Sequence, residues 1–191
     1  MLTATPTQPT DGDMPLFLDA CALAKRYLPE QESSKRMKEM TGRFDRWGGF
    51  VVSSLIELEV ISALAKYARE HPNYSAHLLT KHPEIVDYFR RELSRPAFTI
   101  VELDDDLLGE AADFLKEHPE HAIHAGDAIH LITAMGVRGK LEAGQVLVFV
   151  TADRGLEMAA RAEGFPTANP MRDGVEALAA FSGLDLPRSR R

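Results

Sequence analysis

The chain has 191 residues, 45% of them apolar and 27% charged, a composition typical of a soluble globular protein with one domain. Acidic residues outnumber lysine and arginine by 29 to 22, and the net charge of −7 excludes strong nonspecific binding to duplex DNA. A local basic patch could still hold a nucleic acid.

The single cysteine, Cys21, excludes an internal disulfide bond and a cysteine-rich zinc site. A chain with so few thiols is typical of a reducing, intracellular compartment. The sequence contains no run of about 20 apolar residues, and its first residues lack the basic and apolar regions of a secretory signal. We therefore expect a cytoplasmic protein without a membrane partner.

Strands and helices alternate along the predicted chain. In order, the patterns predict a strand at 16–18, helices at 20–28 and 33–46, a strand at 50–52, helices at 54–69 and 74–94 with a break near Pro83, a strand at 98–101, helices at 104–117 and 126–136, a strand at 146–150, and helices at 154–163 and 171–181. The strands are continuous apolar runs, which suit a parallel sheet buried on both faces. The alternation predicts an α/β protein, with helices on both sides of a central, mainly parallel sheet.

One domain is expected over residues 14–183. Residues 1–13 are rich in Thr, Pro and Asp without periodicity, which predicts a disordered N-terminal tail. Residues 184–191 end in several arginines and predict a basic C-terminal tail.

Acidic residues follow the predicted strands at the point where each strand ends. Asp19 directly follows 16–18, and Asp153 follows 146–150 with only Thr151 and Ala152 between. Because the carboxyl ends of neighbouring parallel strands lie side by side and ligands bind just outside them, both side chains should reach one edge of the sheet. Asp127 opens an apolar helix that should pack deep and carry its acid inward.

A fourth acid comes from the helix predicted at 54–69, which offers Glu57 and Glu59. Both have apolar or small neighbours three and four positions away. The helical periodicity therefore leaves the choice between them open.

Each aspartate also stands where a helix begins, and Asp is a favoured N-cap residue, so capping explains any one of them alone. Together, four carboxylates at one sheet edge repel one another by about 4 kcal/mol per close pair at an effective dielectric near 20. A divalent cation removes this repulsion, and a site of oxygen donors favours Mg²⁺ or Mn²⁺ over zinc. Such an ion can activate a water and stabilise charge on a phosphate oxygen.

Four segments carry a resemblance to a known family. They read F-L-D-A-C-A-L-A-K-R-Y at 17–27, S-S-L-I-E-L-E-V-I-S-A-L at 53–64, H-A-G-D-A-I-H-L-I-T-A at 124–134 and V-F-V-T-A-D-R-G-L at 148–156. In this order they resemble the PIN-domain family, in particular its VapC-type ribonuclease toxins, over residues 14–168. The resemblance implies a three-layer α/β/α PIN-like fold.

By this resemblance, the catalytic and metal-binding acids are Asp19, Glu59, Asp127 and Asp153. The pattern S-S-L-x-x-x-E selects Glu59 over its neighbour Glu57, and Thr151 is implied as a hydroxyl that supports Asp153. The implied activity is cleavage of RNA by a Mg²⁺- or Mn²⁺-dependent endonuclease.

The resemblance also implies a protein partner, an antitoxin whose segment fills a groove and blocks the acidic site. Apolar residues of the helices at 33–46 and 54–69 are available for such a groove or for a homodimer, although the same residues could be wholly internal. They are Met37, Met40, Phe44, Leu58 and Ile61.

Three basic residues near the acids are candidates for contacting RNA phosphates: Lys25, Arg26 and Arg154. The alternative is a solvated helix face. A second basic group, Arg43 and Arg46 beside Trp47, could hold RNA by charge and stacking, but such a tryptophan more often anchors a helix end in the core.

Four histidines, His118, His121, His124 and His130, lie before and inside the helix of Asp127. A metal-binding role is one interpretation. A structural one is favoured, because a proline breaks the run, the first two lie in a polar stretch, and His130 follows Asp127 by about one turn and can pack near the site.

Competing functions fit less well. A haloacid-dehalogenase-like phosphohydrolase would need an acid where Cys21 stands. A receiver-like domain would need paired acids near the first strand, but Asp11 and Asp13 lie in the predicted tail. An inactive PIN-like interaction module is disfavoured because all four motif acids are present.

Overall fold

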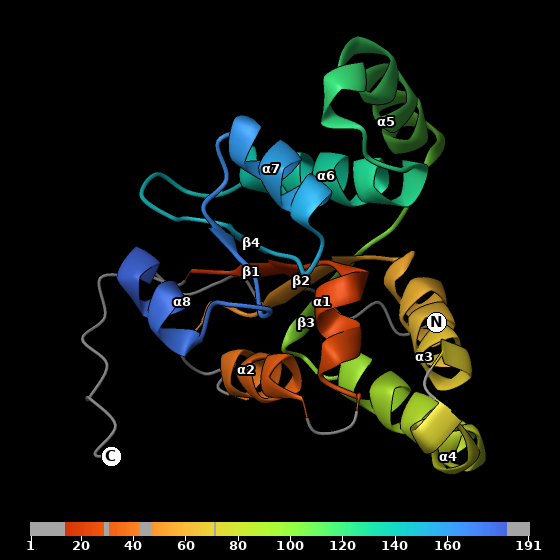
Figure 1. Ribbon diagram of the computed structural model, residues 1–191. Helices are drawn as coiled ribbons and strands as arrows, with labels where there is room; N and C mark the ends of the chain where they lie inside the picture. The colour runs from red at the N-terminus through yellow and green to blue at the C-terminus, as the bar shows by residue number, and fades with distance from the viewer. Residues whose placement is uncertain (1–13, 29–30, 43–46, 71, 183–191) are drawn as a thin grey trace.

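The computed structural model describes residues 14–28, 31–42, 47–70 and 72–182, which form a parallel sheet between two layers of helices (Figure 1). Its strands are β1 (Leu16–Leu18), β2 (Phe50–Ser53), β3 (Phe98–Val101), β4 (Val148–Val150) and β5 (Thr167–Ala168). They pair in the order β3-β2-β1-β4-β5, and every pairing is parallel. The predicted three-layer α/β/α fold is confirmed.

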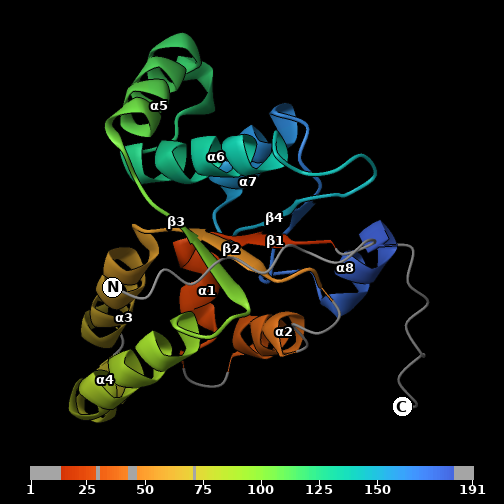
Figure 2. The ribbon, with the colours of Figure 1, turned by 180° about the vertical axis from the view of Figure 1, so that it is seen from behind.

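Helices cover both faces of the sheet, as the two opposite views show (Figures 1 and 2). One layer contains α1 (Ala20–Lys25), α2 (Glu32–Thr41), α3 (Ile56–Glu70), α4 (Pro72–Leu93) and α8 (Val175–Ser182). The other contains α5 (Asp105–Glu117), α6 (Ala125–Arg138) and α7 (Arg154–Ala162), with the short 3-10 turn η1 (Pro119–His121) between α5 and α6. None of the described helices combines the length and apolar character that a bilayer span needs.

The strands divide their side chains between two cores because successive residues of a strand point to opposite faces. In β1, Leu16 and Leu18 pack with α1, α2, α3 and α4, whereas Phe17 between them packs with α6 and α7. Phe17 also stacks on Phe149 of β4, with ring centroids 5.1 Å apart. This two-sided burial explains why the strands are continuous apolar runs.

Several expectations about helix ends and breaks change in the structure. The helix predicted at 20–28 ends at Lys25, and the helix predicted at 171–181 begins at Val175. The break predicted near Pro83 is wrong, because α4 continues through this residue. Pro83 is exposed, so water can replace the backbone hydrogen bond that a proline removes. Helix α2 ends at Thr41, five residues before the predicted end at 46.

Trp47 anchors the segment after α2 in the core. Its side chain is 2% exposed, and its indole Nε1 donates to the main-chain oxygen of Met40 at 2.8 Å. The stacking role for Trp47 is therefore wrong, and its proposed partners Arg43 and Arg46 lie outside the described residues, as do the predicted tails.

A buried ion pair joins α1 to α4. The guanidinium of Arg26 donates from Nε and Nη2 to the two carboxylate oxygens of Glu92 at 2.9 and 2.8 Å, and from Nη1 to Thr41 Oγ1 at 2.8 Å. The hydroxyl groups of Tyr27 and Tyr88 also donate to Glu92, whose side chain is 4% exposed. Burial acts to raise the pKa of Glu92, but the Arg26 hydrogen bonds and charge outweigh it and leave the pKa below its usual value.

Replacing Glu92 with alanine should destabilise the protein strongly, because the Arg26 guanidinium then stays buried without its carboxylate. Loss of one partner of a buried pair costs about 3–5 kcal/mol, to be measured as the free energy of unfolding in urea. The matched control is Glu84→Ala in the same helix, which removes an exposed pair with Lys81 and should cost no more than about 1 kcal/mol. Equal losses in the two variants would contradict the assignment.

The pH dependence of the unfolding free energy of wild type and Glu92→Ala tests the direction of the Glu92 pKa shift. Because the pKa of Glu92 is lower in the folded than in the unfolded chain, its contribution is present above the unfolded pKa, about 4.3. It is lost as the pH falls through the folded pKa. The difference in unfolding free energy between wild type and Glu92→Ala should therefore narrow on acidification.

Candidate active site

The strand order places the site. From β1 the chain adds β2 and then β3 on one side, and later adds β4 and β5 on the other side, so the order reverses between β1 and β4. Ligands of open parallel sheets bind outside the carboxyl ends of strands at such a reversal. Here the main-chain N–H of Asp19 donates to Val150 O at 3.0 Å, which holds the residue after β1 against the end of β4.

Thr151, the first residue after β4, ties the two strand ends together. Its hydroxyl donates to Asp19 Oδ2 at 2.8 Å and accepts the main-chain N–H of Asp153 at 3.0 Å. The resemblance implied support of Asp153 alone, but the structure also links Thr151 to the carboxylate of Asp19. Asp19 is 3% exposed, so this hydrogen bond satisfies a carboxylate that water scarcely reaches.

The Cys21 thiol is a second donor to Asp19 Oδ2. Burial, and then the negative charge of Asp19, raise the pKa of this thiol well above its usual value, so it stays protonated and can donate. The main-chain N–H of Ala152 in turn donates to Cys21 Sγ at 3.2 Å. One oxygen of Asp19 is thus held by two side chains.

Buried His130 of α6 binds Glu59 of α3. Its Nε2 pairs with Glu59 Oε2 and lies 3.7 Å from Asp19 Oδ1, while its Nδ1 lies 3.0 Å from Ser53 Oγ. Burial acts to lower the pKa of His130, but the bond to Glu59 and the charges of Asp19 and Glu59 outweigh it and raise the pKa. The raised pKa favours the protonated ring beside these carboxylates, a contribution that the sequence did not predict.

The structure separates the two glutamates that helical periodicity could not. Glu57 Oε1 accepts from Arg90 Nε of α4 at 2.8 Å, away from α6, whereas Glu59 turns toward α6. Gly126 in the first turn of α6 makes room for this approach, because a Cβ atom there would collide with Glu59 Oε1. A larger residue at Gly126 would displace the Glu59 carboxylate.

Asp127 and Asp153 each accept a main-chain hydrogen bond at the start of a helix, and their carboxylates also repel each other. Asp127 Oδ2 accepts the main-chain N–H of His124 at 2.9 Å, and Asp153 Oδ1 accepts that of Leu156 at 2.8 Å. Asp19 occupies the N-cap position of α1, yet its side chain makes no capping bond. Burial, and then the charges of Asp19 and Asp153, raise the pKa of Asp127, so the three aspartates lie within each other's electrostatic reach.

Among the described residues, the acids at this edge have no lysine or arginine partner. In the described part of the chain, no lysine or arginine forms an ion pair with Asp19, Glu59, Asp127 or Asp153. Within the same residues, these acids do not bring three ligand atoms within 4.8 Å of one another. The donor set is nevertheless oxygen-rich and electrostatically unbalanced, which fits a hard divalent cation.

The three predicted RNA-contacting residues separate into two groups. Arg154 is the exposed first residue of α7, beside Asp153, and Lys25 is the half-buried last residue of α1. Neither forms an ion pair within the described residues. The Arg26 guanidinium is instead held by Glu92 inside the fold, so the prediction that it contacts RNA is replaced by a structural role.

Comparison with known proteins supports the resemblance. The model of the PIN domain family matches residues 16–162. FitAcB from Neisseria gonorrhoeae has a similar structure, with a TM-score of 0.53 and 17% identity over 83% of this chain and 99% of that chain. PAE2754 from Pyrobaculum aerophilum follows with a TM-score of 0.49 and 22% identity over 91% of this chain and 97% of that chain.

A third structure is VapBC2 from Rickettsia felis bound to a DNA fragment from their promoter, with a TM-score of 0.49 and 13% identity over 82% of this chain and 98% of that chain. No curated protein sequence matches significantly. At these identities, FitAcB supports the fold alone. The family model, however, covers most of the chain, including four strands and all four acids, and the chain therefore belongs to the PIN domain family.

Proposed function

We propose that this protein is a metal-dependent endoribonuclease of the VapC type, the toxin of a toxin–antitoxin pair that acts in the cytoplasm. PIN domains form a family of nucleases. The observation that carries the proposal is the convergence of Asp19, Asp127 and Asp153 at the reversal of strand order, where burial and then the charges of Asp19 and Asp153 raise the pKa of Asp127.

Mg²⁺ or Mn²⁺ would be held by Asp19, Asp127 and Asp153, with Glu59 completing the acidic set. When bound, such an ion supplies an activated water and stabilises charge on the phosphate that is attacked. The chain's own residues prepare this chemistry: Thr151 and Cys21 orient Asp19, and His130 orients Glu59.

Lys25 and Arg154 would bind phosphates of a single-stranded or structured RNA on either side of the acids. Both belong to helices that begin directly after a site aspartate, α1 after Asp19 and α7 after Asp153. Arg154 directly follows Asp153 and offers positive charge beside a site that otherwise repels a polyanion, and Lys25 lies one helix length from Asp19.

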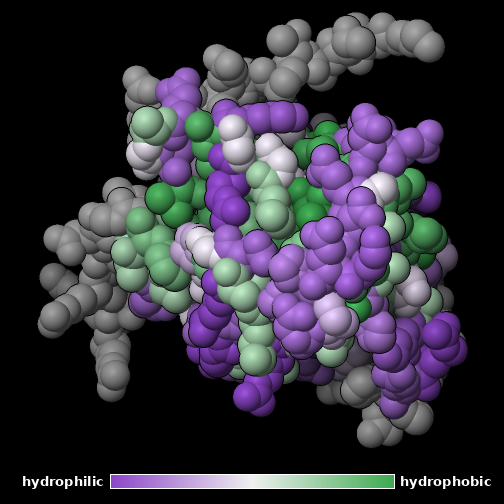
Figure 3. All heavy atoms as spheres, turned by 90° about the horizontal axis from the view of Figure 1, so that it is seen from above, coloured by the Kyte–Doolittle hydropathy of each residue, from purple (hydrophilic) through white to green (hydrophobic). Residues whose placement is uncertain are grey.

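We also propose an antitoxin and a second copy of this chain as partners. Of the apolar residues predicted to contact these partners, Met37 and Met40 are fully buried and are therefore not available. Phe44 lies outside the described residues. Leu58 and half-buried Ile61 remain on α3. Leu58 is 68% exposed next to Glu59, so a partner that covers it would also lie close to this acid. On the face over α5, α6 and α7, apolar side chains are scattered among hydrophilic ones (Figure 3).

The first functional prediction concerns metal and acids. The purified protein should cleave RNA with Mg²⁺ or Mn²⁺, and EDTA should abolish cleavage. Asp19→Asn and Asp153→Asn should each lower the rate by about 100-fold or more, since even residues that only orient metal ligands contribute 10–100-fold. Asp104→Asn is the control, because Asp104 caps α5 with the same bond that Asp153 makes. Full cleavage in EDTA would refute the mechanism.

The second concerns stability without metal. Asn at position 127 can still accept the His124 N–H but carries no charge for Asp19 and Asp153 to repel. In EDTA, the melting temperature of Asp127→Asn should equal or exceed that of wild type. Added Mg²⁺ should stabilise wild type by about 2.7 kcal/mol at a hundredfold excess over its dissociation constant, and the variant much less. A destabilised variant with an unchanged Mg²⁺ response would contradict metal binding by Asp127.

The third concerns RNA affinity, measured in an Asp19→Asn background so that RNA stays intact. Affinity should fall with rising salt, and Lys25→Gln or Arg154→Gln should each reduce the slope of log K against log salt by about 0.7. Lys81→Gln serves as control, because Lys81 is an exposed lysine of α4 already paired with Glu84. A slope that neither substitution changes would remove Lys25 and Arg154 from the interface.

A further inference from the structure

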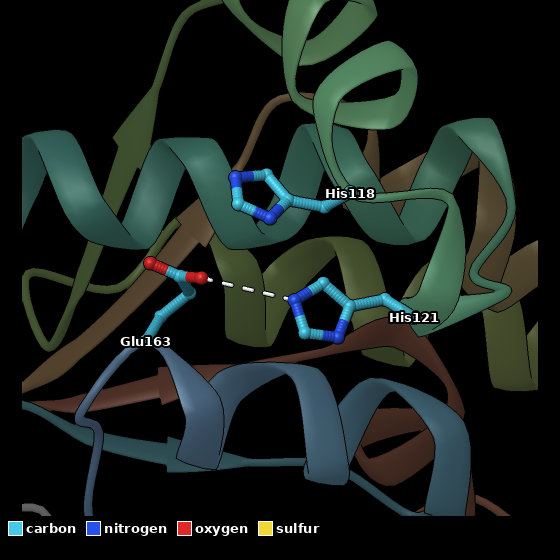
Figure 4. A group of neighbouring side chains, drawn as sticks. All are labelled: His118, His121 and Glu163. Carbon is cyan, nitrogen blue, oxygen red and sulfur yellow. Dashed lines mark ion pairs between the residues drawn. The ribbon is translucent and has the colours of Figure 1, made fainter.

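Two helix ends meet on the side of the sheet that carries α5, α6 and α7 (Figure 4). Helix α5 ends with His118 as its C-cap, η1 contributes His121, and α7 ends with Glu163 as its C-cap. The figure shows both imidazoles and the carboxylate turned toward one another. These three residues are referred to below as the His–His–Glu group.

The spacing within this group suits a small transition-metal ion. One ligand atom from each residue lies within 4.8 Å of the other two, and His121 Nε2 lies 3.8 Å from Glu163 Oε1. Zinc bonds nitrogen and oxygen at about 2.0–2.2 Å, which places tetrahedral ligand atoms about 3.4 Å apart. Small side-chain adjustments would therefore bring the three atoms to coordinating distance. Within the described residues, only this group meets the 4.8 Å spacing.

The two imidazoles are held in place by packing. Side chains three residues apart eclipse in a 3-10 turn, and His118 and His121 accordingly stack with ring centroids 5.5 Å apart. The ring of buried Phe114 packs against both imidazoles, with its centroid 4.7 Å from that of His118 and 5.7 Å from that of His121. Ala122 closes the turn in the left-handed region, with φ of 50°, and its N–H donates to Pro119 O. A non-glycine residue reaches this conformation only when its surroundings enforce it.

Neighbouring groups favour a cation over a simple histidine–glutamate pair. Glu120 Oε1 lies 3.3 Å from His118 Nδ1, and a carboxylate on one ring nitrogen leaves the other as a metal ligand. Arg138 donates to the main-chain oxygen of Glu163 at 2.6 Å and covers the ring of Phe165, so it fixes the end of α7 through the main chain. Two helix C-termini add partial negative charge.

We propose that the His–His–Glu group is a second metal site, which binds Zn²⁺ or another imidazole-preferring divalent ion such as Ni²⁺. Imidazole ligands select these ions over Mg²⁺, the reverse of the preference at the acidic edge. Water would complete the coordination. The bound ion would join the α5–α6 connection to the end of α7, and this inference does not depend on nuclease activity.

The experiment titrates untagged full-length protein with Zn²⁺ by calorimetry in excess Mg²⁺, which occupies the acidic edge. We expect one site per chain, with affinity reduced at least about tenfold in His121→Gln and in Glu163→Gln. Matched controls are His124→Gln and Glu117→Gln, which change the same residue types nearby but outside the group. Both should bind as wild type does, as should Asp19→Asn.

The outcomes separate the sites. No measurable Zn²⁺ binding by wild type would overturn the proposal, as would binding that survives in both His121→Gln and Glu163→Gln. Loss of binding in Asp19→Asn alone would assign the ion to the acidic edge and equally overturn it. The melting temperature of each variant in EDTA checks that it is folded. If His121→Gln does not fold, the Zn²⁺ affinity of Glu163→Gln tests the proposal, because glutamine has the size of glutamate.

Discussion

The parallel pairing of β1 with β4 is the contact on which the rest of the site depends. These strands lie far apart in the chain, and their pairing places Asp19 directly beside the turn that carries Thr151 and Asp153. The resulting concentration of carboxylates would favour unfolding if it stood alone. The chain offsets it locally, with hydroxyl and thiol donors on Asp19 and the ring of His130, whose pKa is raised, between Asp19 and Glu59. The fold therefore supports a cluster of carboxylates whose hydrogen bonds satisfy it only in part.

Most of the fold could be predicted because the strands are buried on both faces and the helices alternate with them. The exception among the strands is β5, Thr167–Ala168, which is too short to show a pattern and follows a proline. It exists because Pro166 O accepts the N–H of Phe149 in β4, a partner visible only once the sheet is assembled. The continuity of α4 through Pro83 likewise depends on which side of the helix faces solvent, a property of the tertiary packing rather than of the local sequence.

In the site, too, the placement of some residues follows from the local sequence, whereas that of others depends on partners far away in the chain. Asp19 and Asp153 were predictable because the ends of apolar strands mark the edge of a parallel sheet. The roles of Glu59 and Arg26 were not derivable from local spacing, since their partners His130 and Glu92 lie 71 and 66 positions away. Gly126 carried a usable signal: a glycine directly before Asp127, in the first turn of an apolar helix, indicates close approach of another group, here the Glu59 carboxylate.

Histidine serves two opposite purposes within a short stretch of this chain. His130 is buried against Glu59 and near Asp19, and the bond to Glu59 and these charges raise its pKa against the opposing effect of burial. His118 and His121 stack at a half-buried turn, with Glu120 beside His118 and Glu163 beside His121. The turn that carries them ends at His124, whose main-chain N–H holds Asp127. An ion bound at the His–His–Glu group would thus restrain the same segment that positions Asp127 at the acidic edge. Because the two proposed sites would prefer different classes of metal, occupancy of one need not compete with occupancy of the other.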